Sequence, residues 1–194
     1  MPTPSAYDNF YFPVARRFIE DNVNRALSAL PAGVRILDVG SQGKDLQRTY
    51  PPDAELLSFD LDPGSKADFL GDICENNRNL IPDASFDAIL LTDVLEHVCQ
   101  PFAAIDEVTR MLKARGSVLF SSPLNCRIHG PVPDCWRFTE FGLQVLFRNF
   151  DCAVFEKLES PDRTLFPLQY FGVWQKPEEE RAIAISELRF ERIT

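Results

Sequence analysis

Short apolar segments alternate with amphipathic helical segments along most of this chain. The segment "VRILDV" at 34–39 follows a helix-stopping "PAG", and strand-like segments recur up to "GSVLFSSP" at 116–123. Because strands that alternate with helices pack as parallel βαβ units, the pattern predicts a doubly wound α/β fold. We expect a mostly parallel, seven-stranded sheet with helices on both faces and an antiparallel closing strand. The expected strands are 34–39, 54–62, 67–72, 85–93, 116–123, 152–159 and 168–176, and the expected helices are 13–30, 44–50, 101–113, 139–150 and the charged tail 177–194.

The charge of the chain restricts its partners. With 29 acidic and 20 basic residues the formal net charge is −9, which disfavours long stretches of nucleic acid and anionic membrane surfaces as partners. The sequence shows no apolar segment of membrane-spanning length and no leader pattern, so we expect a cytoplasmic protein. The five cysteines include no CxxC pair, which favours reduced thiols over disulfides or a zinc ribbon.

Polar residues and glycines follow several of the expected strands. In a doubly wound sheet, ligands bind beyond the carboxyl ends of the strands, at the point where the strand order reverses. The residues to examine are therefore those that end the strands. They are Asp38, Gly40, Asp60, Asp62, Gly71, Asp72, Thr92, Asp93, Pro123 and Asn125.

The turn after the first strand, "GSQGKD", argues against one class of ligand. A dinucleotide site needs glycine where the backbone approaches the pyrophosphate, and Gln42 occupies that place. Asp45 would also repel a phosphate at the helix start. These residues disfavour a dehydrogenase and favour a cofactor without phosphates. Asp60 could accept hydrogen bonds from ribose hydroxyls and Asp72 could meet an adenine edge, although each acid alone is more often an exposed turn residue.

The order of motifs resembles one enzyme family. "ILDVGSQGKD", "LLSFDLDPGSKADFLGDI", "PDASFDAILLTDVLEHV" and "VTRMLKARGSVLFSSP" resemble the successive motifs of class I S-adenosylmethionine-dependent methyltransferases of the small-molecule, methyltransferase type 11-like group. The resemblance spans about residues 33–147. It implies a Rossmann-like fold, S-adenosylmethionine as the cofactor, and transfer of a methyl group to a small-molecule acceptor by in-line displacement. The family usually has glycines where this chain has Gln42 and Lys44, so a non-catalytic cofactor-binding or scaffold protein is the alternative.

The resemblance also implies an organisation for the chain and a set of cofactor contacts. Residues 1–194 would form a single methyltransferase-like domain, with an N-terminal helix at about 13–30, a cofactor-binding core at about 33–123 and a substrate-side loop at about 124–139. The residues expected at the methionine end of the cofactor are Asp38, Gly40, Ser41, Gln42 and Thr92. Those expected around its ribose and adenine are Asp60, Leu61, Asp72 and Ile73.

The segment "TDVLEHV" places Asp93, Glu96 and His97 at i, i+3 and i+4, and hence on one face if the segment is helical. Such a trio could bind a divalent metal. Asp93 and Glu96 could instead form a capping box at a helix start, which we favour, so no metal is predicted. Histidine titrates near neutral pH, and His97 is therefore a candidate catalytic base, with Asp93 as a substrate contact.

The loop "PLNCRIHGPVPDCWRFT" follows the fifth expected strand, on the expected acceptor side. It carries His129, Asp134 and Arg137, which we interpret as a second candidate base and two substrate contacts. The alternative is that Trp136 packs the loop onto the core and Arg137 pairs with an acid. The expected partners are a small-molecule acceptor and, through the charged tail, a second copy in a homodimer.

Overall fold

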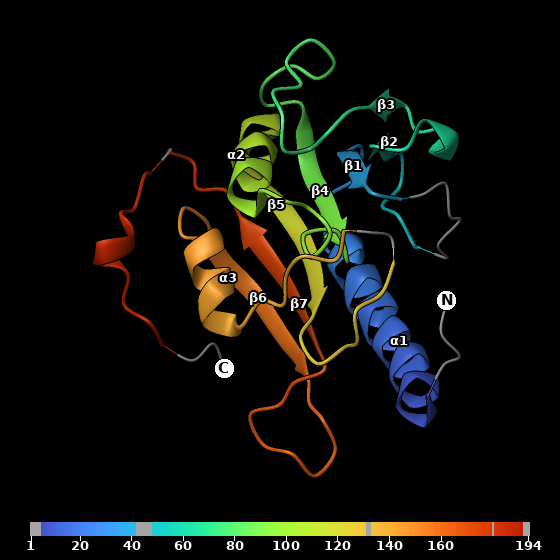
Figure 1. Cartoon of the computed structure of the whole chain (residues 1–194). Helices are drawn as coiled ribbons and strands as arrows, with labels where there is room; N and C mark the ends of the chain where they lie inside the picture. The colour runs from blue at the N-terminus through green and yellow to red at the C-terminus, as the bar shows by residue number, and fades with distance from the viewer. Residues whose placement is uncertain (1–4, 42–47, 131–132, 180, 192–194) are drawn as a thin grey trace.

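The computed structural model describes residues 5–41, 48–130, 133–179 and 181–191 (Figure 1). In this part of the chain, seven strands form one sheet in the order β3-β2-β1-β4-β5-β7-β6. Only β7 runs antiparallel to its neighbours, β5 and β6, which confirms the predicted fold class. The strands are β1 (Arg35–Val39), β2 (Glu55–Asp60), β3 (Phe69–Leu70), β4 (Phe86–Thr92), β5 (Leu112–Pro123), β6 (Asp151–Leu158) and β7 (Gln169–Gln175).

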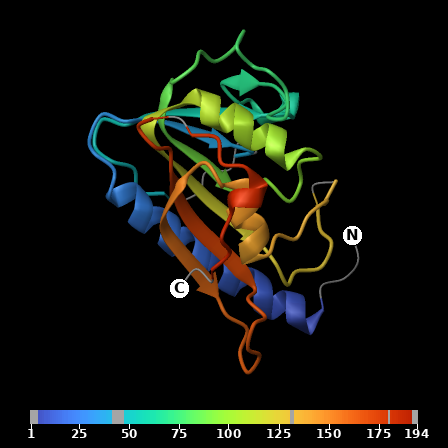
Figure 2. The ribbon, with the colours of Figure 1, turned by 90° about the vertical axis from the view of Figure 1, so that its left-hand side faces the viewer.

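Helices cover both faces of the sheet (Figures 1 and 2). Helix α1 (Ala6–Ser28) packs on one face, where Val23 and Leu27 meet Ile36 of β1 in one buried cluster. Helices α2 (Pro101–Met111) and α3 (Glu140–Leu146) pack on the other face. There Leu37, the next residue of β1, joins the opposite cluster, as the alternation of side chains along a strand requires. Short 3₁₀ helices occupy Pro63–Ser65 and Ile185–Glu187.

The order of the strands creates a switch point between β1 and β4. From β1 the chain moves outward to β2 and β3, then returns to pair β4 with the other side of β1. The connections from β1 and from β4 therefore leave in opposite directions at the carboxyl ends of these strands. A crevice opens where two such connections diverge, and this is where doubly wound sheets bind ligands.

The expected helices differ from the structure, three of them markedly; α2 and α3 end early, at Met111 and Leu146 rather than at 113 and 150. Helix α1 begins at Ala6 rather than at residue 13, because Ser5 and Asp8 form a capping box that starts it earlier and the helix continues through Pro13. The tail 177–194 is not a continuous helix, since its described part holds only the 3₁₀ turn Ile185–Glu187. Of the expected helix 44–50, residues 48–50 are irregular and the rest lies outside the described residues. Among the described helices, none is long and apolar enough to cross a membrane.

Candidate functional site

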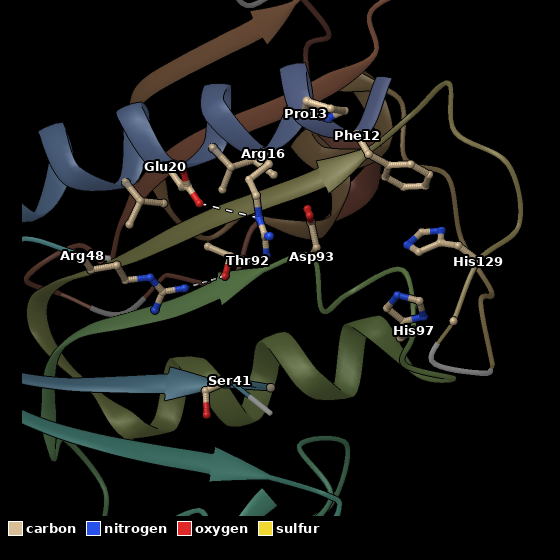
Figure 3. Close-up of a pocket in the computed structure, with 14 residues that line it drawn as sticks. Phe12, Pro13, Arg16, Glu20, Ser41, Arg48, Thr92, Asp93, His97 and His129 are labelled. Atoms are coloured by element: carbon tan, nitrogen blue, oxygen red, sulfur yellow. Dashed lines mark hydrogen bonds and ion pairs between the residues drawn. The ribbon is translucent and has the colours of Figure 1, made fainter. Parts of the chain in front are cut away.

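A pocket of about 610 Å³ opens at the carboxyl ends of β1 and β4 (Figure 3). Helix α1 forms one wall, and the segments after β1, β4 and β5 form the others. The pocket therefore coincides with the switch point of the sheet. Its lining residues are Phe12, Pro13, Arg16, Ile19, Glu20, Val23, Gly40, Ser41, Arg48, Thr92, Asp93, His97, His129 and Gly130.

The turn after β1 is built around Gly40. Its φ of +70° is a conformation that residues with a side chain rarely adopt. Its N–H donates to the Phe59 carbonyl at 2.8 Å, and a Cβ atom here would lie 2.9 Å from Cγ2 of Val94. A residue with a side chain would therefore be strained at this turn, which lines the pocket beside Ser41 where the cofactor's methionine end is expected. The predicted contact Gln42 lies outside the described residues.

Asp38 and Arg48 form a buried ion pair in the wall of the pocket. Nη1 of Arg48 lies 2.6 Å from Oδ2 of Asp38, and Nη2 donates to Oγ1 of Thr92 at 3.1 Å. Burial raises the pKa of Asp38 above its ordinary value, and the Arg48 guanidinium offsets part of that effect. Two predicted cofactor contacts, Asp38 and Thr92, are thus connected by a cation that the sequence analysis did not single out.

The residues predicted to hold adenosine lie on the other side of β1, at the ends of β2 and β3. Asp60 is buried and its Oδ1 accepts from the Asp62 N–H at 2.9 Å, whereas Leu61 is 68% exposed. Asp72 is exposed and accepts from the Cys74 N–H, and Ile73 is a core residue. These four residues do not line the pocket.

Asp93 does not form the predicted capping box. It follows β4 with a φ of +53°, and residues 94–97 form turns rather than a helix. Its Oδ1 accepts from Ser121 at 2.8 Å and from Gln169 at 2.7 Å. The carboxylate is open to solvent through the pocket, although protein atoms surround it on its other sides. That surrounding protein raises the pKa of Asp93, while the two hydrogen bonds oppose the shift.

The chain has two histidines, and the fold brings both to the pocket. The rings of His97 and His129 lie 5.0 Å apart, edge to face, beside Phe12 (Figure 3). Nδ1 of His97 lies 2.9 Å from the Pro133 carbonyl, and Nδ1 of His129 lies 3.2 Å from the Arg127 carbonyl. A carbonyl accepts only from a protonated nitrogen, so these contacts favour hydrogen on Nδ1 and leave Nε2 as the acceptor of the neutral imidazole. Nη2 of Arg137 also lies 3.4 Å from Nδ1 of His129, and Nε2 of His97 lies 3.9 Å from Oε1 of Glu96.

Glu96 is fully buried behind the histidines. Both carboxylate oxygens lack a hydrogen-bond partner among the described residues, and burial raises the pKa of Glu96 well above its ordinary value. Glu96, His97 and His129 each offer a ligand atom within 4.8 Å of the others. The main-chain carbonyl of Glu96 accepts from the N–H groups of Cys135 and Trp136, at 2.6 and 3.1 Å. Glu96 thereby ties the loop 124–139 to the segment that carries His97.

Asp134 and Arg137 face each other inside the loop rather than the pocket. The guanidinium contacts both carboxylate oxygens, at 2.5 and 2.7 Å, and its Nη2 also donates to the Arg127 carbonyl. The hydrogen bonds from Arg137 lower the pKa of Asp134 to about 2. Oδ2 of Asp134 further accepts from the His129 N–H at 2.8 Å. The pair therefore shapes the loop that presents His129.

Sequence reasoning missed the residues that reach the site from distant segments. Phe12 and Arg16 line the pocket from α1, and Tyr11 and Gln169 contact one another across 158 residues of sequence. Nothing in their local sequence marks them. Tyr11 and Phe12 precede the predicted helix 13–30, and Gln169 lies in a closing strand. The packing of α1 against β5 and β7 brings Phe12 and Arg16 to the pocket and places Tyr11 against Gln169.

Comparisons with known proteins identify the family. A family model described as a methyltransferase domain matches residues 11–157, whereas no curated protein matches the chain by sequence. Among solved structures, the N-methyltransferase NodS from Bradyrhizobium japonicum with S-adenosylhomocysteine has a TM-score of 0.62 at 18% identity, covering 84% of this chain and 87% of that one. A methyltransferase from Archaeoglobus fulgidus has 0.63 at 16%, covering 89% and 100%, and the [4+2]-cyclase SpnF has 0.62 at 18%, covering 83% and 80%. The chain therefore belongs to the class I S-adenosylmethionine-dependent methyltransferases.

Proposed function

We propose that this protein transfers a methyl group from S-adenosylmethionine to a small-molecule acceptor bound in the pocket. The observation that carries the proposal is the continuity of the pocket. One wall holds Gly40, Ser41 and Thr92, where the family places the methionine end of the cofactor, and the opposite part holds Asp93 and the two histidines. The methyl group of the cofactor and the nucleophile of the acceptor could therefore meet inside one cavity. Bringing these two groups together is the main requirement of a displacement reaction.

The cofactor supplies an electrophilic methyl group on a sulfonium, so the protein has to position the acceptor and remove its proton. Asp93 lies at the pocket surface and can accept a hydrogen bond from the acceptor. His97 and His129 each leave Nε2 unprotonated when neutral, so either can take the proton as the new bond forms. Asp134 and Arg137 act on the acceptor indirectly in this proposal, because they hold the loop that carries His129.

Adenosine would be held at the ends of β2 and β3. Asp60 ends β2 with a buried carboxylate, which is suited to the two ribose hydroxyls, and Leu61 exposes an apolar surface for the adenine ring. Asp72 and Ile73 follow β3 and are assigned to the edge and face of the adenine. The open turn at Gly40 then leads from adenosine to the pocket.

The test is a transfer assay with radiolabelled S-adenosylmethionine and fractionated cell extract. We expect label in small-molecule products, formed in step with S-adenosylhomocysteine, and none in the protein or nucleic acid fractions. Gly40→Ala should abolish both binding and transfer, because its Cβ would meet Val94 at a positive φ. Cofactor binding without transfer to any fraction would support the alternative, a non-catalytic cofactor-binding or scaffold protein.

A further inference from the structure

Behind the pocket, a chain of hydrogen bonds runs from α1 to Asp93. Oη of Tyr11 donates to Oε1 of Gln169 at 2.9 Å, and Nε2 of Gln169 donates to Oδ1 of Asp93 at 2.7 Å. Oγ of Ser121 donates to the same Oδ1 at 2.8 Å. Tyr11 is 3% exposed, Gln169 1% and Ser121 0%, so this chain is shielded from water while Asp93 at its end lines the pocket.

The direction of these hydrogen bonds is fixed by chemistry. A carboxylate can only accept, so Gln169 must turn its NH₂ group to Asp93 and its oxygen to Tyr11. Tyr11 stabilises that orientation, because its phenol O–H donates to the amide oxygen. Burial raises the pKa of Tyr11, which keeps the phenol protonated and able to donate. A Gln169 amide turned the other way would place its oxygen against the carboxylate.

The two donors also distinguish the oxygens of Asp93. Gln169 and Ser121 both donate to Oδ1 and thereby occupy its two lone pairs. Oδ2 is then the oxygen left for a molecule in the pocket. Asp93 holds this position at a φ of +53°, a conformation that costs free energy for a residue with a side chain.

We propose that Tyr11 and Gln169 are positioning residues, which keep Asp93 ionised and oriented so that Oδ2 accepts a hydrogen bond from the acceptor. The inference rests on the proposed function and deepens it. It assigns the acceptor to compounds whose nucleophile carries a hydrogen, an O–H or N–H group, because only such a group can donate to Oδ2. The methyl group would replace that hydrogen.

The titratable groups around Asp93 affect its ionisation together with the hydrogen bond from Gln169. His97 and Glu96 approach from the segment after β4, and His129 and Cys126 from the loop. Tyr11 and the pocket-lining Arg16 come from α1. When protonated, the two histidines favour the ionised carboxylate, whereas Glu96 disfavours it when charged. Without donation from Gln169, the balance moves toward the protonated acid. The acidic limb of the pH–rate profile should then move to higher pH.

Tyr11→Phe tests this inference, with Tyr7→Phe as its matched control. Tyr7 lies one turn earlier on α1, and its hydroxyl donates to the Asn125 carbonyl at an exposed position. Tyr11→Phe should lower kcat about tenfold, a loss comparable with one hydrogen bond, while the Kd for S-adenosylmethionine stays within about twofold. Tyr7→Phe should change neither quantity. Tyr11→Phe combined with Gln169→Leu should be no slower than Gln169→Leu alone, because the two residues act through one chain.

A second readout needs no acceptor. Carbon-13 NMR titration of the Asp93 carboxyl, assigned with Asp93→Asn, should show its pKa raised by about half a unit or more in Tyr11→Phe and unchanged in Tyr7→Phe. An unchanged Asp93 titration in Tyr11→Phe, or equal losses of kcat, cofactor affinity and Tm, would overturn the positioning role. A shifted titration in a protein that methylates nothing would instead refute the proposed function and leave the positioning of Asp93 standing.

Discussion

Arg48 and Asp38 form an ion pair at the switch point of the sheet, with Nη1 of Arg48 2.6 Å from Oδ2 of Asp38. Their side chains are only 5% and 10% exposed, so the two charges neutralise each other where water has little access. The guanidinium also reaches Thr92, which ends β4. The pair therefore joins the ends of β1 and β4, on the wall where the methionine end of the cofactor is expected.

We expect Arg48→Met to destabilise the protein by about 3–5 kcal/mol, because it leaves the Asp38 carboxylate buried without its counter-charge. Urea unfolding of the two single variants and the double variant measures the coupling. Arg48→Met combined with Asp38→Asn should recover most of the loss, since it removes both charges together. A single-variant loss below about 1 kcal/mol would mean that the pair is well hydrated in solution.

Asp60→Ala should weaken S-adenosylmethionine binding far more than Asp62→Ala. Hydrogen bonds to a charged group contribute roughly 1.5–3 kcal/mol, and Asp60 is the buried acid assigned to the ribose. Asp62 instead caps the 3₁₀ turn Pro63–Ser65 by accepting from the Gly64 N–H. Isothermal titration calorimetry distinguishes the two, and equal small losses would show that the assignment at the end of β2 is wrong.

The sequence predicted the sheet well because each core strand carries its own signal. Ile36 and Leu37 are buried on opposite faces, as expected for a strand between two helical layers. Gly40 could also be recognised, because a glycine that follows a strand and an acid is typical of a ligand-binding turn. These signals lie in short stretches of sequence, so they can be recognised without knowing which distant residues the stretch contacts.

The interpretations that failed depended on distant partners. Asp93 and Glu96 have the spacing of a capping box, but Ser121 and Gln169 hold Asp93 from two other strands and no helix begins there. Arg48 lies in an irregular segment without a motif, and its role is visible only once Asp38 is beside it. Such contacts leave no periodic signal in one sequence, so the wall of the pocket needed the structure.

Chelation of divalent metal should leave the affinity for S-adenosylmethionine unchanged. Glu96, His97 and His129 are close enough to hold an ion, but they lie away from the strand ends assigned to adenosine, in the part of the site proposed for the acceptor. Titration calorimetry with and without EDTA checks this expectation, with metal analysis of the purified protein alongside. A loss of cofactor affinity that added metal restores would contradict it.

Asp134→Asn should lower stability at neutral pH by roughly 2 kcal/mol, since Arg137 depresses the pKa of this carboxyl to about 2 and its side chain is 1% exposed. A depressed pKa means that the contribution is complete above the unfolded value near 4. Most of it is lost as the pH falls from about 4 to 2, so the variant and the wild type should come close to one another there. Urea unfolding across this range measures it, with the exposed Asp106→Asn as the control. A difference that is undiminished at pH 2 would contradict the ionic origin.

His129→Ala should reduce methyl transfer and spare both cofactor affinity and stability. The ring lines the pocket from the loop 124–139, whereas adenosine is assigned to β2 and β3. Trp136→Ala, by contrast, should lower the free energy of unfolding by about 1–2 kcal/mol. It removes the ring stack on Phe138 and the hydrogen bond to the Val98 carbonyl. This loss is smaller than that expected for a fully buried tryptophan, because Trp136 is 41% exposed.

Ile128→Ala is the control for His129→Ala, since Ile128 precedes the histidine and is 82% exposed. Each variant needs a cofactor titration, a melting curve and a transfer assay with the acceptor fraction. Ile128→Ala should match the wild type in all three, because its side chain buries little surface that could be lost. If His129→Ala lowers Tm as much as Trp136→Ala does, His129 is part of the packing of the loop. The acceptor would then be activated by His97 alone.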